Sequence, residues 1–236
     1  MTSIGPLPAT ASGHAPSVRA AERLLSRAHT SVEGLFRAVD VLDKERRAAN
    51  ASPKGRSALA EMDVLRSAVI FTGAGLDATM KRLVNDVGRA LIAGGATGAR
   101  ANFESFLKAE LAQPKVPDGL RDAILHVHPD QSLLAYFLAA RTKASFQGSS
   151  DLSSRVRQTL GIPKSAVPDT RLESLDGFFV ARNNIVHQMD IEDPSSGSVA
   201  RIKRSPVQVA TDCGEVFAVA GLLIRAAAAV CRKAGV

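Results

Sequence analysis

The sequence predicts an all-α fold, a helical bundle of long antiparallel helices with shorter helices inserted between them. Three observations support this prediction. Apolar residues recur at three- and four-residue steps over three long segments, which is the spacing of one helix face. No strand–helix–strand alternation is visible, and only residues 198–203 have a strand-like pattern. Apolar residues make up 45% of the 236 residues, enough for a buried core without disulfides.

The first predicted helix follows an N-terminal tail. Residues 1–17 are rich in Pro, Ala, Ser and Gly, which predicts a disordered tail, and a single all-α domain is expected over residues 18–236. The helix should begin at Val18 and end at the charged run 44–47. Its apolar stripe consists of Leu24, Leu25, Ala28, Val32, Leu35, Phe36, Val39 and Leu42.

A second long helix is expected over residues 57–93. Gly73 and Gly75 lie inside it, and each costs about 1 kcal/mol of helix stability relative to Ala. We therefore expect a close helix contact or a kink at these glycines. Gly94, Gly95 and Gly98 indicate where the helix ends.

Turn signals divide the middle of the chain into shorter helices, expected over residues 102–112, 119–126, 131–143 and 152–160. A helix capped by Asp169 or Thr170 should continue to Met189 or Asp190. Residues 198–203 could form a short β-ribbon. The last helix should have Ser205 as its N-cap and Pro206 in its first turn, and run to about Lys233.

The last helix contains the most apolar stretch of the chain, residues 216–231, which Arg225 interrupts. This stretch is too short to span a membrane, so we expect a buried helix and no membrane partner. Cys213 and Cys231 would lie roughly 27 Å apart along the same helix and could not form a disulfide within it. Two unpaired cysteines and the lack of a secretory signal favour a cytoplasmic location.

Metal and cofactor sites are not expected. The two adjacent histidines, His126 and His128, are two residues apart, which would turn them to different sides of a helix, and no HExxH motif is present. No phosphate-binding glycine loop precedes a helix. Histidine also occurs at positions 14, 29 and 187, without metal-ligand spacing.

The most informative segment is residues 178–188, where polar side chains interrupt a helix rich in core residues. Asn183 and His187 are four residues apart and therefore lie on one helix face, where the amide could fix the imidazole tautomer. Asn184 is three residues before His187. Arg182 lies about 140° away around the helix, but its long side chain can reach the same edge.

This combination fits the chemistry of an RNA phosphodiester. The 2′-hydroxyl attacks the neighbouring phosphate once a base removes its proton, and the leaving 5′-oxygen needs an acid. Histidine can act as either near neutral pH, because its ordinary pKa is about 6.5. Arginine holds phosphate oxygens and stays charged. No metal is required, and DNA, which lacks the 2′-hydroxyl, should resist cleavage.

Arg182-Asn183 followed by His187 resembles the Arg-polar-xxx-His signature of the HEPN family, and the match lies before one last helix, as in many members. The resemblance implies an α-helical bundle that forms a homodimer, in which the motif helices of two copies face each other. It also implies a metal-independent endoribonuclease that leaves 2′,3′-cyclic phosphates. Many such proteins are toxins or phage-defence effectors with an antitoxin or other defence-system partner. Arg182, Asn183 and His187 would then be the catalytic residues.

Similar spacings occur elsewhere in the chain. Arg121 to His126 fits the signature, and Arg23 to His29 fits a looser version, although the short helix that holds Arg121 is a poor dimer seam. Further basic residues lie before and after the motif, and they could guide RNA or simply form a solvated face. These RNA-binding candidates are Asn184, Arg155, Arg157, Arg201, Lys203 and Arg204.

Charge and composition leave three functions open. The net charge is +7, and the excess lies mainly in residues 1–56 and 141–204, whereas only 4% of residues are aromatic. Basic charge without stacking side chains suits a protein that grips phosphates and argues against one that reads bases. The alternatives to a nuclease are a catalytically silent HEPN-like module that binds RNA, a nucleotide or a partner, and a helical interaction protein whose charge serves only solubility.

Overall fold

The computed structural model describes residues 3–7, 15–49, 59–197 and 199–236, and the regular secondary structure within them is helical. The predicted all-α fold is confirmed. A lone antiparallel bridge joins Ile191 and Arg201 where the β-ribbon was expected. The helices are α1 (Pro16–Ala49), α2 (Leu59–Ala93), α3 (Thr97–Leu111), α4 (Asp118–Leu125), α5 (Pro129–Thr142), α6 (Ser149–Asp151), the π-helix η1 (Leu152–Arg157), α7 (Asp169–Glu173), α8 (Asp176–Gln188) and α9 (Pro206–Ala234).

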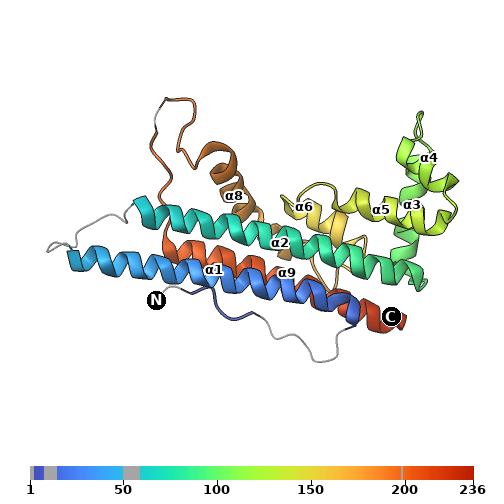
Figure 1. Ribbon diagram of the computed structural model, residues 1–236, viewed down its shortest axis with the longest axis horizontal. Helices are drawn as coiled ribbons and strands as arrows, with labels where there is room; N and C mark the ends of the chain where they lie inside the picture. The colour runs from blue at the N-terminus through green and yellow to red at the C-terminus, as the bar shows by residue number, and fades with distance from the viewer. Residues whose placement is uncertain (1–2, 8–14, 50–58, 198) are drawn as a thin grey trace.

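Three long helices, α1, α2 and α9, lie side by side and form the body of the molecule (Figure 1). Helix α1 runs antiparallel to both neighbours, whereas α2 and α9 run in the same direction (Figure 1). The expected antiparallel arrangement therefore holds for α1 only, because the short helices between α2 and α9 return the chain to its starting end. Helices α3–α5 lie at one end of this body, and α8 projects from it nearer the other (Figure 1).

The contact between α1 and α2 explains one of the two glycines inside α2. A Cβ atom added to Gly75 would collide with the Cβ atom of Ala28 on α1. The missing side chain thus allows the two helices to approach closely, and the extra contact offsets the low helix propensity of glycine. This confirms the expected close helix contact.

Helix α9 supplies one side of the core. By length and composition its 29 residues could cross a membrane, although 61% of its most apolar window is buried inside the molecule. The buried residues, which include Val216, Leu223 and Ala227, pack in the shared core. The expected buried helix is confirmed. Ser205 caps it, since its Oγ accepts a hydrogen bond from the Gln208 amide at 3.5 Å.

Both cysteines lie in this buried part of α9, as expected for small core residues. Burial raises the pKa of the Cys213 thiol to about 12, and burial also raises the pKa of Cys231. Because the thiolate is the nucleophile, neither side chain is suited to thiol chemistry at neutral pH.

The N-terminal segment differs from the expected disordered tail. Ile4 is buried, and its carbonyl oxygen would lie 2.8 Å from a Cβ atom on Gly214 of α9. His29 of α1 donates from Nε2 to the Gly5 carbonyl oxygen at 2.8 Å. Residues 3–7 therefore pack on α1 and α9, and α1 begins at Pro16. The rest of the expected tail, residues 1–2 and 8–14, lies outside the described residues.

Several helix boundaries in the middle of the chain differ from the predicted ones. Helix α3 begins at Thr97, five residues earlier than expected, because Gly98 does not end a helix but approaches Gly161, whose Cα would lie 3.4 Å from a Cβ atom at Gly98. Residues 152–157 form a π-helix instead of an α-helix. The helix expected over residues 169–190 is divided into α7 and α8 at Ser174 and Leu175.

Candidate functional site

The predicted motif lies on α8, which packs on α2 and on the first part of α9. Phe178, Phe179 and Ile185 turn inward and join the core. The side chains of Val180 and His187 are exposed, and Asn183 is half-buried between these two surfaces. The helix therefore presents one edge to solvent on which apolar side chains such as Val180 accompany the imidazole.

Arg182 lies along α2 and not at the open edge. A Cβ atom added to Gly73 of α2 would stand 3.4 Å from Cγ and 3.7 Å from Nε of Arg182. The second glycine of α2 thus leaves room for the arginine stem. At the far end of the side chain, Nη1 donates to Oδ1 of Asn183 at 2.8 Å. Asn183 therefore holds the half-buried guanidinium in place.

His187 occupies the last turn of α8, and its side chain is exposed. It makes no hydrogen bond or ion pair with any residue in the described part of the chain. The amide of Asn183, one turn earlier, binds Arg182 instead of the imidazole. The expectation that Asn183 and His187 share a face holds, but the amide fixes the guanidinium and not the tautomer of His187. Asn184 is half-buried, and its carbonyl oxygen accepts the Asp190 amide at 3.0 Å.

The end of α8 is anchored by a carboxylate that the sequence analysis missed. Met189 and Asp190 both have positive φ, at 53° and 60°, which turns the chain sharply after the helix. The Asp190 side chain is fully buried. Its Oδ2 accepts from Nε of Arg66 at 2.9 Å and from Nε of Arg204 at 2.8 Å, and its Oδ1 accepts from Nη2 of Arg204 at 2.5 Å. Two guanidinium groups thus bind one carboxylate.

Arg201 extends this anchor. Its Nε donates to the Met189 carbonyl oxygen at 2.9 Å, and its Nη1 donates to Oδ1 of Asp63 at 2.8 Å. The same carboxylate oxygen accepts from Arg66 at 3.1 Å. These donors of Arg201 and Arg204 hold the end of α8 against α2, and RNA binding by the two residues stays a prediction. Lys203 is exposed and stays a candidate.

The two basic candidates that precede the motif also have structural partners. Arg157 is 2% exposed and donates to the Val167 carbonyl oxygen at 2.9 Å, and its Nη1 lies 2.6 Å from Oδ1 of Asp169. Arg155 stacks over the Phe146 ring at 4.3 Å and donates to the Arg141 carbonyl oxygen at 2.9 Å. Both arginines of the π-helix therefore have partners within the protein, and RNA contacts by this pair stay a prediction.

The competing matches to the signature do not form a site. Helix α4 ends at Leu125, so His126 lies in extended backbone outside the helix that holds Arg121. Arg121 pairs with Asp118, and Nδ1 of His126 accepts the His128 amide at 3.1 Å. His29 is buried, with its ring 5.1 Å from that of Phe217. Of the three matches, the pair Arg182 and His187 therefore has both residues on one helix and an imidazole that is exposed to solvent.

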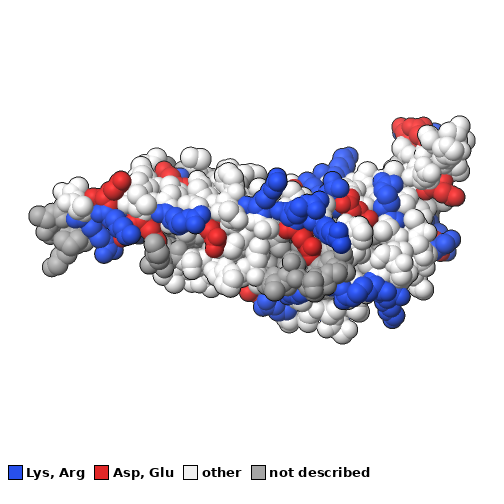
Figure 2. All heavy atoms as spheres, turned by 60° about the horizontal axis from the view of Figure 1, so that its bottom comes forward, with Lys and Arg blue, Asp and Glu red and all other residues white. Residues whose placement is uncertain are grey.

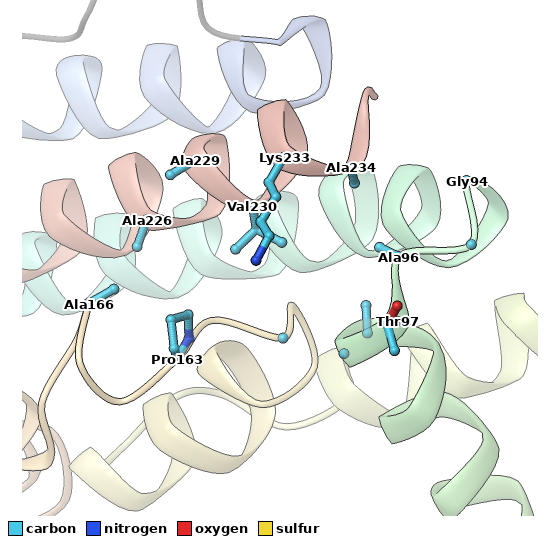
Figure 3. Close-up of a pocket in the computed structure, with 14 residues that line it drawn as sticks. Gly94, Ala96, Thr97, Pro163, Ala166, Ala226, Ala229, Val230, Lys233 and Ala234 are labelled. Atoms are coloured by element: carbon cyan, nitrogen blue, oxygen red, sulfur yellow. The ribbon is translucent and has the colours of Figure 1, made fainter.

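A hollow of about 560 Å³ lies far along the body from α8, between the start of α3, the 161–166 loop and the end of α9 (Figure 3). Its wall is mostly Gly and Ala, and the amine of Lys233 points into it (Figure 3). Lys233 is the single charged residue of this lining, so the hollow offers no acid–base pair. A smaller hollow of about 480 Å³ lies between α8 and α9 and includes Phe178, Ala181 and Arg204.

Within the described residues, no three His, Cys, Asp or Glu side chains gather as metal ligands would. No known protein-family model, curated protein or solved structure matches this chain. The functional assignment therefore rests on α8 and on the residues that hold it in place.

Proposed function

We propose that this chain is a metal-independent endoribonuclease in which His187, Arg182 and Asn183 of α8 act on the RNA backbone. The observation that carries this proposal is an exposed imidazole on the same short helix as a guanidinium held by a neighbouring amide. The buried carboxylate of Asp190, three residues beyond the imidazole, and its two arginines fix the end of that helix. A preorganised helix end favours a defined position for the reactive group.

In the proposed reaction His187 removes the proton of a 2′-hydroxyl, and the 2′-oxygen attacks the adjacent phosphorus. The bond from phosphorus to the 5′-oxygen then breaks, an acid protonates the leaving oxygen, and the products carry a 2′,3′-cyclic phosphate and a 5′-hydroxyl. Arg182 stabilises the negative charge that develops on the phosphate oxygens. Asn183 positions Arg182 through the 2.8 Å hydrogen bond.

The reaction needs a base and an acid, and α8 offers a single imidazole. We propose that a second copy of the chain supplies the other, with the two α8 helices facing each other. Exposed apolar side chains beside His187 support this arrangement, since Val180 is 59%, Val186 43% and Met189 63% exposed. Apolar groups clustered on a short helix are typical of protein–protein contacts.

One observation favours a catalytically silent module as the second candidate. The guanidinium of Arg182 is half-buried against α2 and already bonded to Asn183, whereas a phosphate-binding arginine needs free donors. Such a module would bind RNA or a partner without turnover. The two candidates differ in one measurable property, the appearance of cleaved RNA.

The proposed cellular role follows from the resemblance to HEPN proteins. The chain would be a cytoplasmic toxin or phage-defence effector that a partner protein, such as an antitoxin, holds inactive. Induced expression in a bacterial host should then arrest growth, and His187→Ala should relieve the arrest at equal protein level. Growth arrest by the His187→Ala chain would contradict this role.

The decisive experiment is RNA cleavage in EDTA, with end-group analysis of the products. The wild-type chain should cleave RNA but not the DNA of the same sequence. Loss of the base should slow cleavage about 100-fold or more in His187→Ala, and Arg182→Ala should have a comparable effect. His128→Ala, which removes another exposed histidine, is the matched control and should cleave normally. Undiminished cleavage by the His187→Ala chain would overturn the assignment, and salt-sensitive binding without products would identify the silent module.

A further inference from the structure

Four arginines of α1 form an exposed row on the side opposite its buried stripe. Arg19, Arg23 and Arg27 follow one another at four-residue steps, and Arg37 lies on the same side. None of the four guanidinium groups makes a hydrogen bond or ion pair with a residue in the described part of the chain. We call these four side chains the arginine ridge. Their donors are free to bind a ligand.

The acidic residues nearest the arginine ridge on its own helix, Glu22, Glu33 and Asp40, are less exposed than the four arginines and form no ion pair with them. The exposed residues of α1 between positions 19 and 38 include no Asp or Glu. Glu22 and Glu33 are only partly exposed, and Oε2 of Glu33 lies 3.9 Å from Nδ1 of the buried His29. Figure 2 shows the resulting band of Lys and Arg side chains along this face, with few acidic groups between them. Positive charge that no local acid neutralises attracts anions.

Helix α2 continues this surface. Gly75 meets Ala28 of α1, so the two helices are close enough to share one face. Arg82 and Arg89 are seven residues apart and both are exposed. Arg82 is paired with Asp86 at 2.6 Å, whereas the guanidinium of Arg89 has no partner among the described residues. The basic surface is therefore wider than one helix.

An exposed aromatic ring lies on α2, at the same level along the axis as the arginine ridge. Phe71 of α2 is 54% exposed. Since α1 and α2 run antiparallel and Gly75 meets Ala28, Phe71 stands about level with position 32, between Arg27 and Arg37. Proteins that bind unpaired nucleic acid combine aromatic rings with rows of cations, because any base can stack on a ring.

We propose that the arginine ridge binds the phosphate backbone of single-stranded RNA. Arg19, Arg23 and Arg27 are about 6 Å apart along the axis, Arg37 lies about 15 Å further, and the row extends about 27 Å, which suits a linear polyanion and not a small anion. Guanidinium groups bind phosphate oxygens in pairs and are more weakly hydrated than amines. This inference deepens the proposed function and rests on it, because it names a second surface, on α1 and across α2 from α8, that binds the RNA substrate.

The test measures binding in the full-length His187→Ala chain, so that the RNA stays intact. The probe is a fluorescently labelled single-stranded RNA, titrated at salt concentrations between 50 and 200 mM. Replacing Arg19, Arg23 and Arg27 with Glu should weaken binding roughly tenfold or more and reduce the slope of log K against log salt by about 2. The matched control replaces Lys108, Lys115 and Lys143 with Glu, which changes the net charge equally on other elements, and binding should change less than twofold.

If the Glu variant does not fold, Arg19, Arg23 and Arg27 are replaced with Gln instead. The slope of log K against log salt should then change in the same direction. Phe71→Ala should weaken binding of the single strand about fivefold or more and leave a duplex of the same sequence unaffected; an equal loss on both would overturn the assignment to single strands. Equal binding by the ridge and control variants would overturn the ridge. Ridge-dependent binding of phosphatidylserine vesicles, with RNA binding unchanged, would also overturn it.

The failure of this inference and the failure of the proposed nuclease are distinguishable. If the wild-type chain never cleaves RNA but binds it through the arginine ridge, RNA binding by the ridge is supported and the proposed nuclease activity is refuted. If the wild-type chain cleaves RNA and the ridge variants bind it normally, the proposed nuclease activity is supported and RNA binding by the ridge is refuted.

Discussion

Two groups of arginines in this molecule have opposite surroundings. Those that flank α8 in sequence, such as Arg157 and Arg204, are buried or half-buried and donate to carboxylates and carbonyl oxygens. Those of the arginine ridge are exposed and have no partner among the described residues. Closeness in sequence to a candidate site therefore does not make a charge available to a ligand. Availability depends on whether the fold brings an acidic group to that arginine.

The largest expected effect concerns the buried anchor of α8. Asp190→Ala leaves Arg66 and Arg204 without their shared carboxylate, and removing one member of a buried ion pair typically costs 3–5 kcal/mol, so we expect a loss of about that size in the free energy of unfolding. Asp193→Ala, three residues further in the exposed loop, should cost under about 1 kcal/mol. Urea denaturation measures both. Similar losses in the two variants would contradict the distinction between a buried, ion-paired carboxylate and an exposed one.

A second, smaller effect compares one arginine from each group. Arg157→Ala removes a side chain that is 2% exposed and leaves the Val167 carbonyl oxygen without its donor, so we expect about 2–4 kcal/mol of destabilisation. Arg23→Ala on the ridge should change stability by less than about 0.5 kcal/mol. Thermal and urea denaturation of the two variants provide the measurement. A stability loss in Arg23→Ala as large as that in Arg157→Ala would mean that the ridge arginines are structural as well.

The smallest expected effect is the acid sensitivity of the Arg157 partner. Hydrogen bonds from Lys164 and then Arg157 hold the pKa of Asp169 below its ordinary value of 3.8. As the pH falls, the unfolded chain therefore takes up this proton first. The stabilisation is complete above pH 3.8 and is lost as the pH falls through the lowered pKa. The free energy of unfolding, measured between pH 2 and 6, should thus depend less on pH in Asp169→Asn than in the wild-type chain. An unchanged pH dependence would contradict a stabilising ion pair between Arg157 and Asp169.

Local patterns predicted much of the fold. The apolar stripes of α1, α2 and α9 placed these helices to within a few residues, because periodicity reports which face is buried. Ser205 and Pro206 marked the start of α9 correctly, since cap chemistry is local. Of the two alternatives for the α2 glycines, a close contact or a kink, the contact is what the structure has, with Ala28 at Gly75 and with Arg182 at Gly73.

The remaining features depend on partners that are distant in sequence. Asp190 and Arg66 are 124 residues apart, and nothing in the local sequence of either indicates the other. The partners of Arg201 and Arg204 within the protein could not be predicted for the same reason. The available signal for the anchor was Asp190 itself. It is an acidic residue that follows directly after the helix that ends in His187 and Gln188. The exposed position of His187 was predictable, because it lies on the polar edge of its helix.

The central claim is that α8 cleaves the RNA and the arginine ridge holds it. Single-turnover cleavage over a range of protein concentrations, for His187→Ala and for the Arg19, Arg23 and Arg27 to Glu variant, tests this claim most directly. We expect the His187→Ala chain to lose the rate at saturation and keep the half-saturating concentration. We expect the ridge variant to keep the saturated rate and raise the half-saturating concentration roughly tenfold or more. An undiminished saturated rate in His187→Ala, or an unchanged half-saturating concentration in the ridge variant, would contradict this division of roles.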